Sequence, residues 1–384
     1  MTLLRESSPT WCELSVAMRQ NKGPETHHVL VPDKFHRTGI VVLALSLVSV
    51  GVLILFGAAT KSAGSGPKQP IVVRSDMRNS AASRTGPSNA ALGIYAGPGN
   101  PGAVTALGQM IGHQPPYAEE FLDDTSWQTI EDPSWFLARW WGSGYSMIWS
   151  VPILPSGSPT GATALPGVSL QEGAAGAYDV YFSTLAKALV AGGQESSIIR
   201  IGYEFNGSSF PWAALGQAAN FTEYWRRIVD AMRSVPGANF KFVWNPYDDN
   251  APSSTDLADY YPGNAYVDLI GLDVYSQSVG NNSDSSSMFR ALETNPYGLD
   301  WLSSFAARHH KDLVLPQWGI GDAPSQNRAA ASQEQDGYAI FVADMLHWIA
   351  SRDVVEATYW DYGLGAVSSG SNPKIEAALA HWDE

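Results

Sequence analysis

From residue 89 onward, short apolar segments alternate with longer stretches of helical spacing, and this alternation limits the chain to few folds. Apolar strands separated by helices indicate a parallel sheet covered by helices. The rival arrangement is a doubly wound open sheet, but no glycine-rich phosphate loop follows the first strand. Eight such units predict a (β/α)8 TIM barrel. The expected strands are 92–96, 118–122, 147–153, 197–203, 240–245, 267–275, 313–318 and 355–360.

Composition narrows the class of function. The 384 residues carry a formal net charge of -14, which argues against a general nucleic-acid binder, whose footprint is basic. The single cysteine, Cys12, excludes an intrachain disulfide and a cysteine-rich metal site. The chain holds 14 Trp, 16 Tyr and 13 Phe but only 16% charged residues. A sugar-binding cleft needs aromatic faces of this kind, although a large aromatic core has the same composition.

The N-terminal quarter differs from the rest. Residues 1–88 carry ten Lys/Arg and five Asp/Glu, whereas the remaining residues carry 13 and 32. The segment 38–60 has no charged residue, and about 20 apolar residues span the hydrocarbon core of a bilayer. A cleaved signal peptide is the alternative, but its apolar region is shorter and nearer the N-terminus. The sequence thus predicts a cytoplasmic tail (1–37), a transmembrane anchor (38–60), a Gly/Ser/Pro-rich tether (61–88) and the barrel (89–384).

Polar residues gather where the predicted strands end, and active sites of such barrels lie at the C-terminal strand ends. Glu204 follows the fourth strand beside Arg200 and Asn206. Cleavage of a glycoside requires one carboxylic acid that protonates the leaving oxygen and a second carboxylate that attacks or activates water. Aromatic residues at the same ends, such as Trp244 and Trp360, suit a sugar cleft or simple packing equally well.

The linked motifs RIGYEFNG, FVWNP, DLIGLDVY, LPQWG and TYWD resemble glycoside hydrolase family 26 over about residues 90–384. The resemblance places Glu204 at the acid/base position, Tyr275 beside the nucleophile, Trp360 under the cleaved sugar and Trp212 in a tryptophan cluster. It implies retaining hydrolysis of β-mannans, less often of other β-glucans or xylans, with no metal and no cofactor. The substrate-binding candidates are Arg200, Asn206, Trp212, Trp244, Tyr275, Trp318 and Trp360.

Two positions depart from the family pattern. Tyr203 replaces the usual histidine before the acid/base, and Gln317 replaces the glutamate nucleophile on strand 7. A neutral amide cannot form a glycosyl-enzyme. Three explanations are open: an inactivating Glu→Gln substitution made to trap substrate, a natural protein that binds glycans without cleaving them, or a different base. The candidates for that base are Asp322, Asp361 and Asp248.

The sequence therefore predicts a membrane-anchored glycoside hydrolase whose partners are a polysaccharide and the lipid bilayer, with no nucleic acid. The alternative is a glycan-binding pseudoenzyme that takes part in polysaccharide synthesis or export. Basic residues flank the apolar span on both sides, so the positive-inside rule gives no orientation. The expected substrate places the protein in the plasma membrane with a single pass and the barrel on the extracytoplasmic side.

Overall fold

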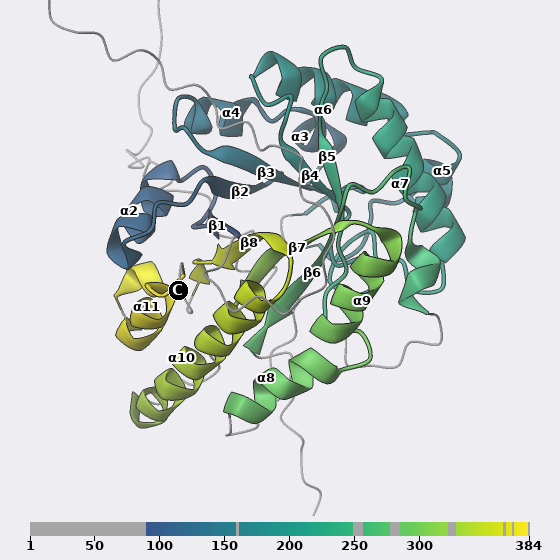
Figure 1. Ribbon diagram of the computed structural model, residues 1–384. Helices are drawn as coiled ribbons and strands as arrows, with labels where there is room; N and C mark the ends of the chain where they lie inside the picture. The colour runs from purple at the N-terminus through teal and green to yellow at the C-terminus, as the bar shows by residue number, and fades with distance from the viewer. Residues whose placement is uncertain are drawn as a thin grey trace, which may run out of the picture. The chain divides into compact units, whose positions relative to one another are not determined.

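A closed barrel of eight parallel strands forms the centre of the computed structural model, in the order β1 to β8, with β1 pairing with β8 (Figure 1). The structure describes residues 90–158, 161–248, 256–276, 285–321, 328–363, 366–370 and 372–382. The predicted TIM barrel is confirmed. The strands are β1 Ala91–Tyr95, β2 Tyr117–Phe121, β3 Ser146–Val151, β4 Ile198–Ile201, β5 Lys241–Trp244, β6 Leu269–Tyr275, β7 Asp312–Gly319 and β8 Val354–Trp360.

Helices surround the barrel and follow the strands in turn (Figure 1). In the helix between β4 and β5, Phe221, Trp225, Ile228 and Met232 are buried, and their spacing places them on one face. The described helices are α2 Pro101–Ile111, α3 Trp127–Glu131, α4 Ser134–Trp140, α5 Leu170–Ala174, α6 Asp179–Ala191, α7 Ala218–Arg233, η1 Leu257–Tyr260, α8 Ser285–Thr294, α9 Leu299–His309, α10 Arg328–Ser351, η4 Val367–Ser369 and α11 Pro373–Leu379.

The interior of the barrel is layered. Alternate side chains of a strand point to opposite faces, and one apolar layer inside the barrel consists of Ile148, Ile198, Val243, Leu269 and Val314. Moving two residues along β3, β4 and β5 from this layer leads to Ser150, Arg200 and Asn245, all of which are buried. A polar layer therefore lies on the apolar one, towards the C-terminal strand ends.

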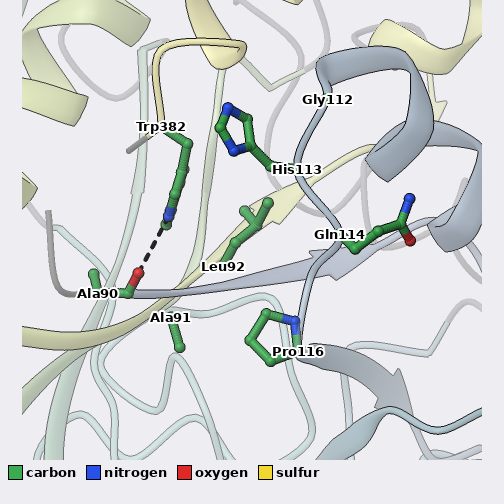
Figure 2. Close-up of a pocket in the computed structure, with 8 residues that line it drawn as sticks. All are labelled: Ala90, Ala91, Leu92, Gly112, His113, Gln114, Pro116 and Trp382. Atoms are coloured by element: carbon green, nitrogen blue, oxygen red, sulfur yellow. Dashed lines mark hydrogen bonds between the residues drawn. The ribbon is translucent and has the colours of Figure 1, made fainter. Parts of the chain in front are cut away.

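A cavity of about 370 Å³ lies at the opposite end of the barrel, where β1 begins (Figure 2). Leu92, His113 and Trp382 line it, and the Trp382 indole Nε1 donates to the Ala90 carbonyl at 3.1 Å. Because it lies at the start of β1, this cavity is separate from the polar layer.

The predicted tail, anchor and tether (1–37, 38–60 and 61–88) lie outside the described residues. Among the residues that the structure does describe, none of the helices combines the length and apolar character needed to cross a membrane.

Candidate active site

Arg200 is the centre of the polar layer and is completely buried on β4. Its guanidinium donates to Asn245 Oδ1, to Asp273 Oδ2, to Glu119 Oε1 at 2.5 Å and to Gln317 Oε1 at 3.0 Å. Burial alone would lower the pKa of Arg200, but the carboxylates of Asp273 and Glu119 raise it above its usual value, so the charge persists. One cation thus organises side chains from β2, β5, β6 and β7.

Gln317 lies on β7, at the position where the sequence resemblance predicts a nucleophile. Its side chain is 1% exposed, and its Nε2 donates to the Tyr275 hydroxyl at 2.6 Å while its Oε1 accepts from Arg200. A carboxylate of the same shape could accept from both partners, because a phenol and a guanidinium are both donors. The surroundings of Gln317 therefore suit either an amide or a carboxylate.

A local irregularity brings Gln317 into the polar layer. The registers of β7 with both neighbours shift, between Gly271 and Asp273 on β6 and between Leu315 and Trp318 on β7. Pro316 packs against Gly271, where an added Cβ would lie 2.7 Å from the proline Cδ. Bulges of this kind re-aim side chains next to active sites.

Glu204 lies at the end of β4 in an unusual backbone conformation. Its φ is 53°, in the left-handed region that disfavours side chains, and its N–H donates to the Asn245 carbonyl at 2.9 Å. Strain of this kind costs about 1–3 kcal/mol and concentrates at functional sites. The backbone at Glu204 is therefore consistent with a functional position.

The carboxyl group of Glu204 is 4% exposed and hydrogen-bonds the carboxyl of Asp273, which requires a proton between them. Burial raises the pKa of Glu204 to about 7, although the charge of Arg200 opposes this. Burial also raises the pKa of Asp273 well above its usual value. A carboxyl that holds a proton near neutral pH can act as a general acid.

Two glutamates of β2, Glu119 and Glu120, belong to the site region but were not among the sequence candidates. Both are completely buried, and burial raises the pKa of Glu119 to about 7 and that of Glu120 to about 8. The available signal was the pair of acids inside a predicted barrel strand, because buried acids are rare unless they have partners.

Aromatic rings surround the polar layer and form a small cluster apart from the main core. Tyr95 stacks on Trp360 with ring centroids 4.4 Å apart, and Phe121 packs edge-on against Trp360 at 5.7 Å. Tyr275 also contacts Trp360, at 6.4 Å. The structure thus brings together five predicted site residues: Arg200, Glu204, Tyr275, Gln317 and Trp360.

Three predicted tryptophans lie elsewhere, in the main hydrophobic core. Trp244 is fully buried, stacks on Phe305 and donates its indole N–H to the Tyr260 carbonyl at 3.0 Å. Trp318 is also fully buried and packs against Tyr359 and Trp382. Trp244 precedes the inward-pointing Asn245, and Trp318 follows the inward-pointing Gln317. Because successive side chains of a strand point to opposite faces, both tryptophans point towards the helices.

Trp212 is likewise fully buried, stacked on Phe210 at 4.9 Å, and its indole N–H donates to the Tyr203 carbonyl at 2.7 Å. It supports the segment that carries Glu204. Trp212, Trp244 and Trp318 therefore pack, whereas the sequence predicted that they bind substrate.

The remaining candidates have mostly structural contacts. The Asn206 amide N–H donates to the Tyr247 carbonyl at 2.9 Å, and its oxygen accepts from the Tyr247 N–H at 3.0 Å. These two hydrogen bonds join the loops after β4 and β5. Asp361 Oδ1 accepts from the backbone N–H groups of Val367 and Ser368, which holds the loop after β8. Asp248 is buried, with its N–H on the Asp273 carbonyl. Asp322 lies outside the described residues.

The fold and the site together define a parallel barrel with a buried acid and an aromatic platform at the C-terminal strand ends. Sequence comparison agrees with this class. "Glycosyl hydrolase family 26" matches residues 185–307, a segment that contains Glu204 and Tyr275 and ends before Gln317.

Relatives of known type share part of the chain. Endoglucanase H of Acetivibrio thermocellus is 33% identical over 106 residues, which is 26% of this chain and 12% of that protein. Mannan endo-1,4-beta-mannosidase of Bifidobacterium adolescentis is 32% identical over 124 residues, 32% of this chain and again 12% of that protein. The chain thus spans only a small part of the length of these relatives.

A solved structure supports the fold. The double mutant of the Cellulomonas fimi endo-beta-1,4-mannanase superposes with a TM-score of 0.55 at 16% identity, over 77% of this chain and 72% of that chain. The chain is thus similar to glycoside hydrolase family 26 over part of its sequence, and it shares the barrel fold of the solved mannanase.

Proposed function

We propose that the barrel acts on a β-linked polysaccharide, a β-mannan or a close analogue. Glu204 is the general acid/base, and position 317 is the nucleophile site, now occupied by an amide. The observation that carries the proposal is the pair of contacts at Gln317, from Arg200 at 3.0 Å and to Tyr275 at 2.6 Å. These contacts hold the side chain of Gln317, which has the shape of a glutamate, next to the polar layer around Arg200.

The chemistry follows from protonation states. Glu204, with its raised pKa, would protonate the glycosidic oxygen as the bond to the leaving sugar breaks. A glutamate at position 317 would attack the anomeric carbon and form a covalent intermediate, which water would hydrolyse with Glu204 now acting as base. The Gln317 amide lacks the charge for this attack, so the chain as it stands binds the glycan and hydrolyses it slowly or not at all.

Gln317 also favours a second function. A barrel that keeps an acid, an arginine and an aromatic platform but lacks the nucleophile is suited to hold a glycan without cleaving it. In this case the protein would be a glycan-binding pseudoenzyme that handles a polysaccharide during its synthesis or export.

Replacement of Gln317 by Glu tests the proposal. We expect Gln317→Glu to raise hydrolysis of β-mannan by at least about 10³-fold, because it restores a covalent route. Release of reducing ends from mannan, β-glucan and xylan measures this. Gln317→Met is the matched control, since it keeps the volume of the side chain but supplies no carboxylate.

Three outcomes separate the hypotheses. If the native chain is already fully active and Gln317→Glu leaves its activity unchanged, the nucleophile or base lies elsewhere, and the residues to mutate are Asp322, Asp361 and Asp248. A Gln317→Glu variant that stays inert while the native chain binds mannan would support the glycan-binding function. Neither binding nor cleavage of any of the three polysaccharides would refute both functions.

We also propose that residues 38–60 anchor the protein in the plasma membrane, with the barrel on the extracytoplasmic side. The support is the uncharged apolar sequence of this segment and the location of the expected substrate. Carbonate extraction of membranes tests the anchor, and protease treatment of intact cells tests the side. Release of the full chain by carbonate would overturn the anchor.

A further inference from the structure

An exposed tryptophan of α4 stands out among the aromatic residues, most of which are buried. Trp135 is 51% exposed, and it follows the first residue of α4. This helix and α2 lie on the same side of the barrel, next to β1 and β2 (Figure 1). A single exposed apolar ring is common on protein surfaces and shows no function by itself, so its meaning depends on where it lies relative to the site.

The ring of Trp135 packs on the loop that follows β1. A Cβ added at Gly99 would lie 2.7 Å from Trp135 Cζ3, so the backbone of Gly99 is in close contact with the indole. Gly99 has a φ of 58°, which also favours glycine at this position. Because β1 ends at Tyr95, this contact places Trp135 at the end of the barrel that carries the candidate site.

A buried acid fixes this arrangement. Glu120 Oε2 accepts the N–H of Gly99 at 2.6 Å and the indole N–H of Trp140 at 2.8 Å. It therefore ties the loop after β1 to α4, the helix that carries Trp135. The guanidinium of Arg139 lies over the Trp135 ring, 4.9 Å from its centroid, and restricts the ring further. Trp135 is exposed but held in place.

The same loop connects Trp135 to the aromatic cluster of the site. A Cβ added at Gly97 would lie 2.9 Å from the Tyr362 ring, and Tyr362 in turn contacts Trp360 with ring centroids 6.1 Å apart. Gly97 and Gly99 are two residues apart, a separation of at most about 7 Å. Aromatic rings thus follow one another from Trp360 through Tyr362 to Trp135, with Trp360 8% and Trp135 51% exposed.

We propose that Trp135 is an outer binding platform for a sugar ring of a long β-linked glycan, a few sugar units away from the ring that stacks on Trp360. This inference rests on the proposed function, since it extends the same glycan-binding site. Rigid aromatic faces suit sugar rings because they supply apolar contact with little loss of conformational entropy. A glycan must be long enough to cover both rings, so the platform would select for chain length.

The test uses the full native chain, in detergent, with β-1,4-linked mannobiose, mannotetraose and mannohexaose in calorimetric titrations. We expect Trp135→Ala to weaken mannohexaose binding about tenfold, with a loss that diminishes as the glycan shortens. Trp141→Ala is the matched control, because Trp141 follows the same helix and is 79% exposed. We expect it to bind all three glycans like the native chain.

A second measurement needs no variant. Oxidation of exposed tryptophans by N-bromosuccinimide, located by mass spectrometry, should modify both Trp135 and Trp141 in the free protein. Mannohexaose should protect Trp135 and leave Trp141 reactive, whereas mannobiose should protect neither. Equal protection of the two tryptophans, or none of Trp135, would overturn the platform.

The outcomes distinguish this inference from the proposed function. Mannohexaose binding that is lost in Trp360→Ala but unchanged in Trp135→Ala would reject the platform and leave the proposed function intact. Absence of binding of every mannan oligosaccharide and of polymeric mannan, glucan and xylan would reject both.

Discussion

The β4 and β7 ends of the site meet at the same guanidinium, yet they differ in chemistry. At the β4 end, Glu204 keeps its carboxyl, in strained backbone, with a pKa raised to about 7 by burial. At the β7 end, Gln317 has no charge, and the chain is aimed by register shifts and a proline. Under the proposed function, this difference separates the two halves of the mechanism, because the acid is kept and the nucleophile position holds an amide.

The largest expected effect tests the β4 end. In the Gln317→Glu background, Glu204→Gln should lower hydrolysis of β-mannan by about 10²–10⁴-fold, because the leaving oxygen loses its proton donor. Mannan binding should change little, and it serves as the control for folding. Hydrolysis that persists undiminished would remove Glu204 from the chemistry.

The next effect tests how the β7 end is aimed. Gly271→Ala puts a Cβ 2.7 Å from Pro316 Cδ, and overpacking of this kind costs about 1–3 kcal/mol of unfolding free energy. In the Gln317→Glu background it should also lower kcat, because the carboxylate moves. Gly102→Ala, on α2 with its nearest neighbour at 3.9 Å, is the control. Equal unfolding midpoints in urea for the two variants would show that Pro316 adapts freely.

A smaller effect compares amide and carboxylate at position 317. Tyr275→Phe removes the 2.6 Å hydrogen bond. The loss should be about 0.5–1.5 kcal/mol beside Gln317 and about 1.5–3 kcal/mol beside Gln317→Glu, because bonds to charged groups are stronger. A double-mutant cycle of unfolding free energies measures the difference. A coupling of zero would mean that the phenol does not distinguish the two groups.

The last prediction concerns pH. Burial raises the pKa of Glu119 and Glu204 to about 7 and that of Glu120 to about 8, against about 4.3 in the unfolded chain. The native state therefore holds more protons between these values, so unfolding free energy should fall as pH rises from about 4.5 to 8. Melting temperatures across this range should decline, and Glu120→Gln should flatten the decline. A melting temperature that rises with pH would contradict the argument.

The order of strands and their ends could be predicted because an apolar strand followed by polar residues is visible in the sequence. Which residue of each end faces the barrel could not. Asn245 follows Trp244, and Gln317 precedes Trp318. In each pair either residue is a plausible site residue, so the sequence does not show which of the two points into the barrel. Strands of a parallel barrel are apolar on both faces, and the irregularities of β7 hide its alternation.

Glu119, Glu120 and Asp273 were harder to recognise as parts of the site. An acid in a sequence is usually a solvated surface group, and its burial depends on partners that lie far away in the chain. Here the partner is Arg200, whose guanidinium hydrogen-bonds Glu119 and Asp273, 81 and 73 residues away in the chain. Only the closed barrel brings them together.

The contacts of Gln317 have a genetic consequence. Glutamine and glutamate codons differ at a single nucleotide, and the environment of Arg200 and Tyr275 accommodates the side chain of either residue. Under the proposed function, one point mutation would therefore convert a glycan binder into a hydrolase, or the reverse, without a stage at which the barrel is unable to fold. Among proteins that share this barrel, we therefore expect glutamine and glutamate at this position to alternate between related sequences, rather than a single early loss of the glutamate.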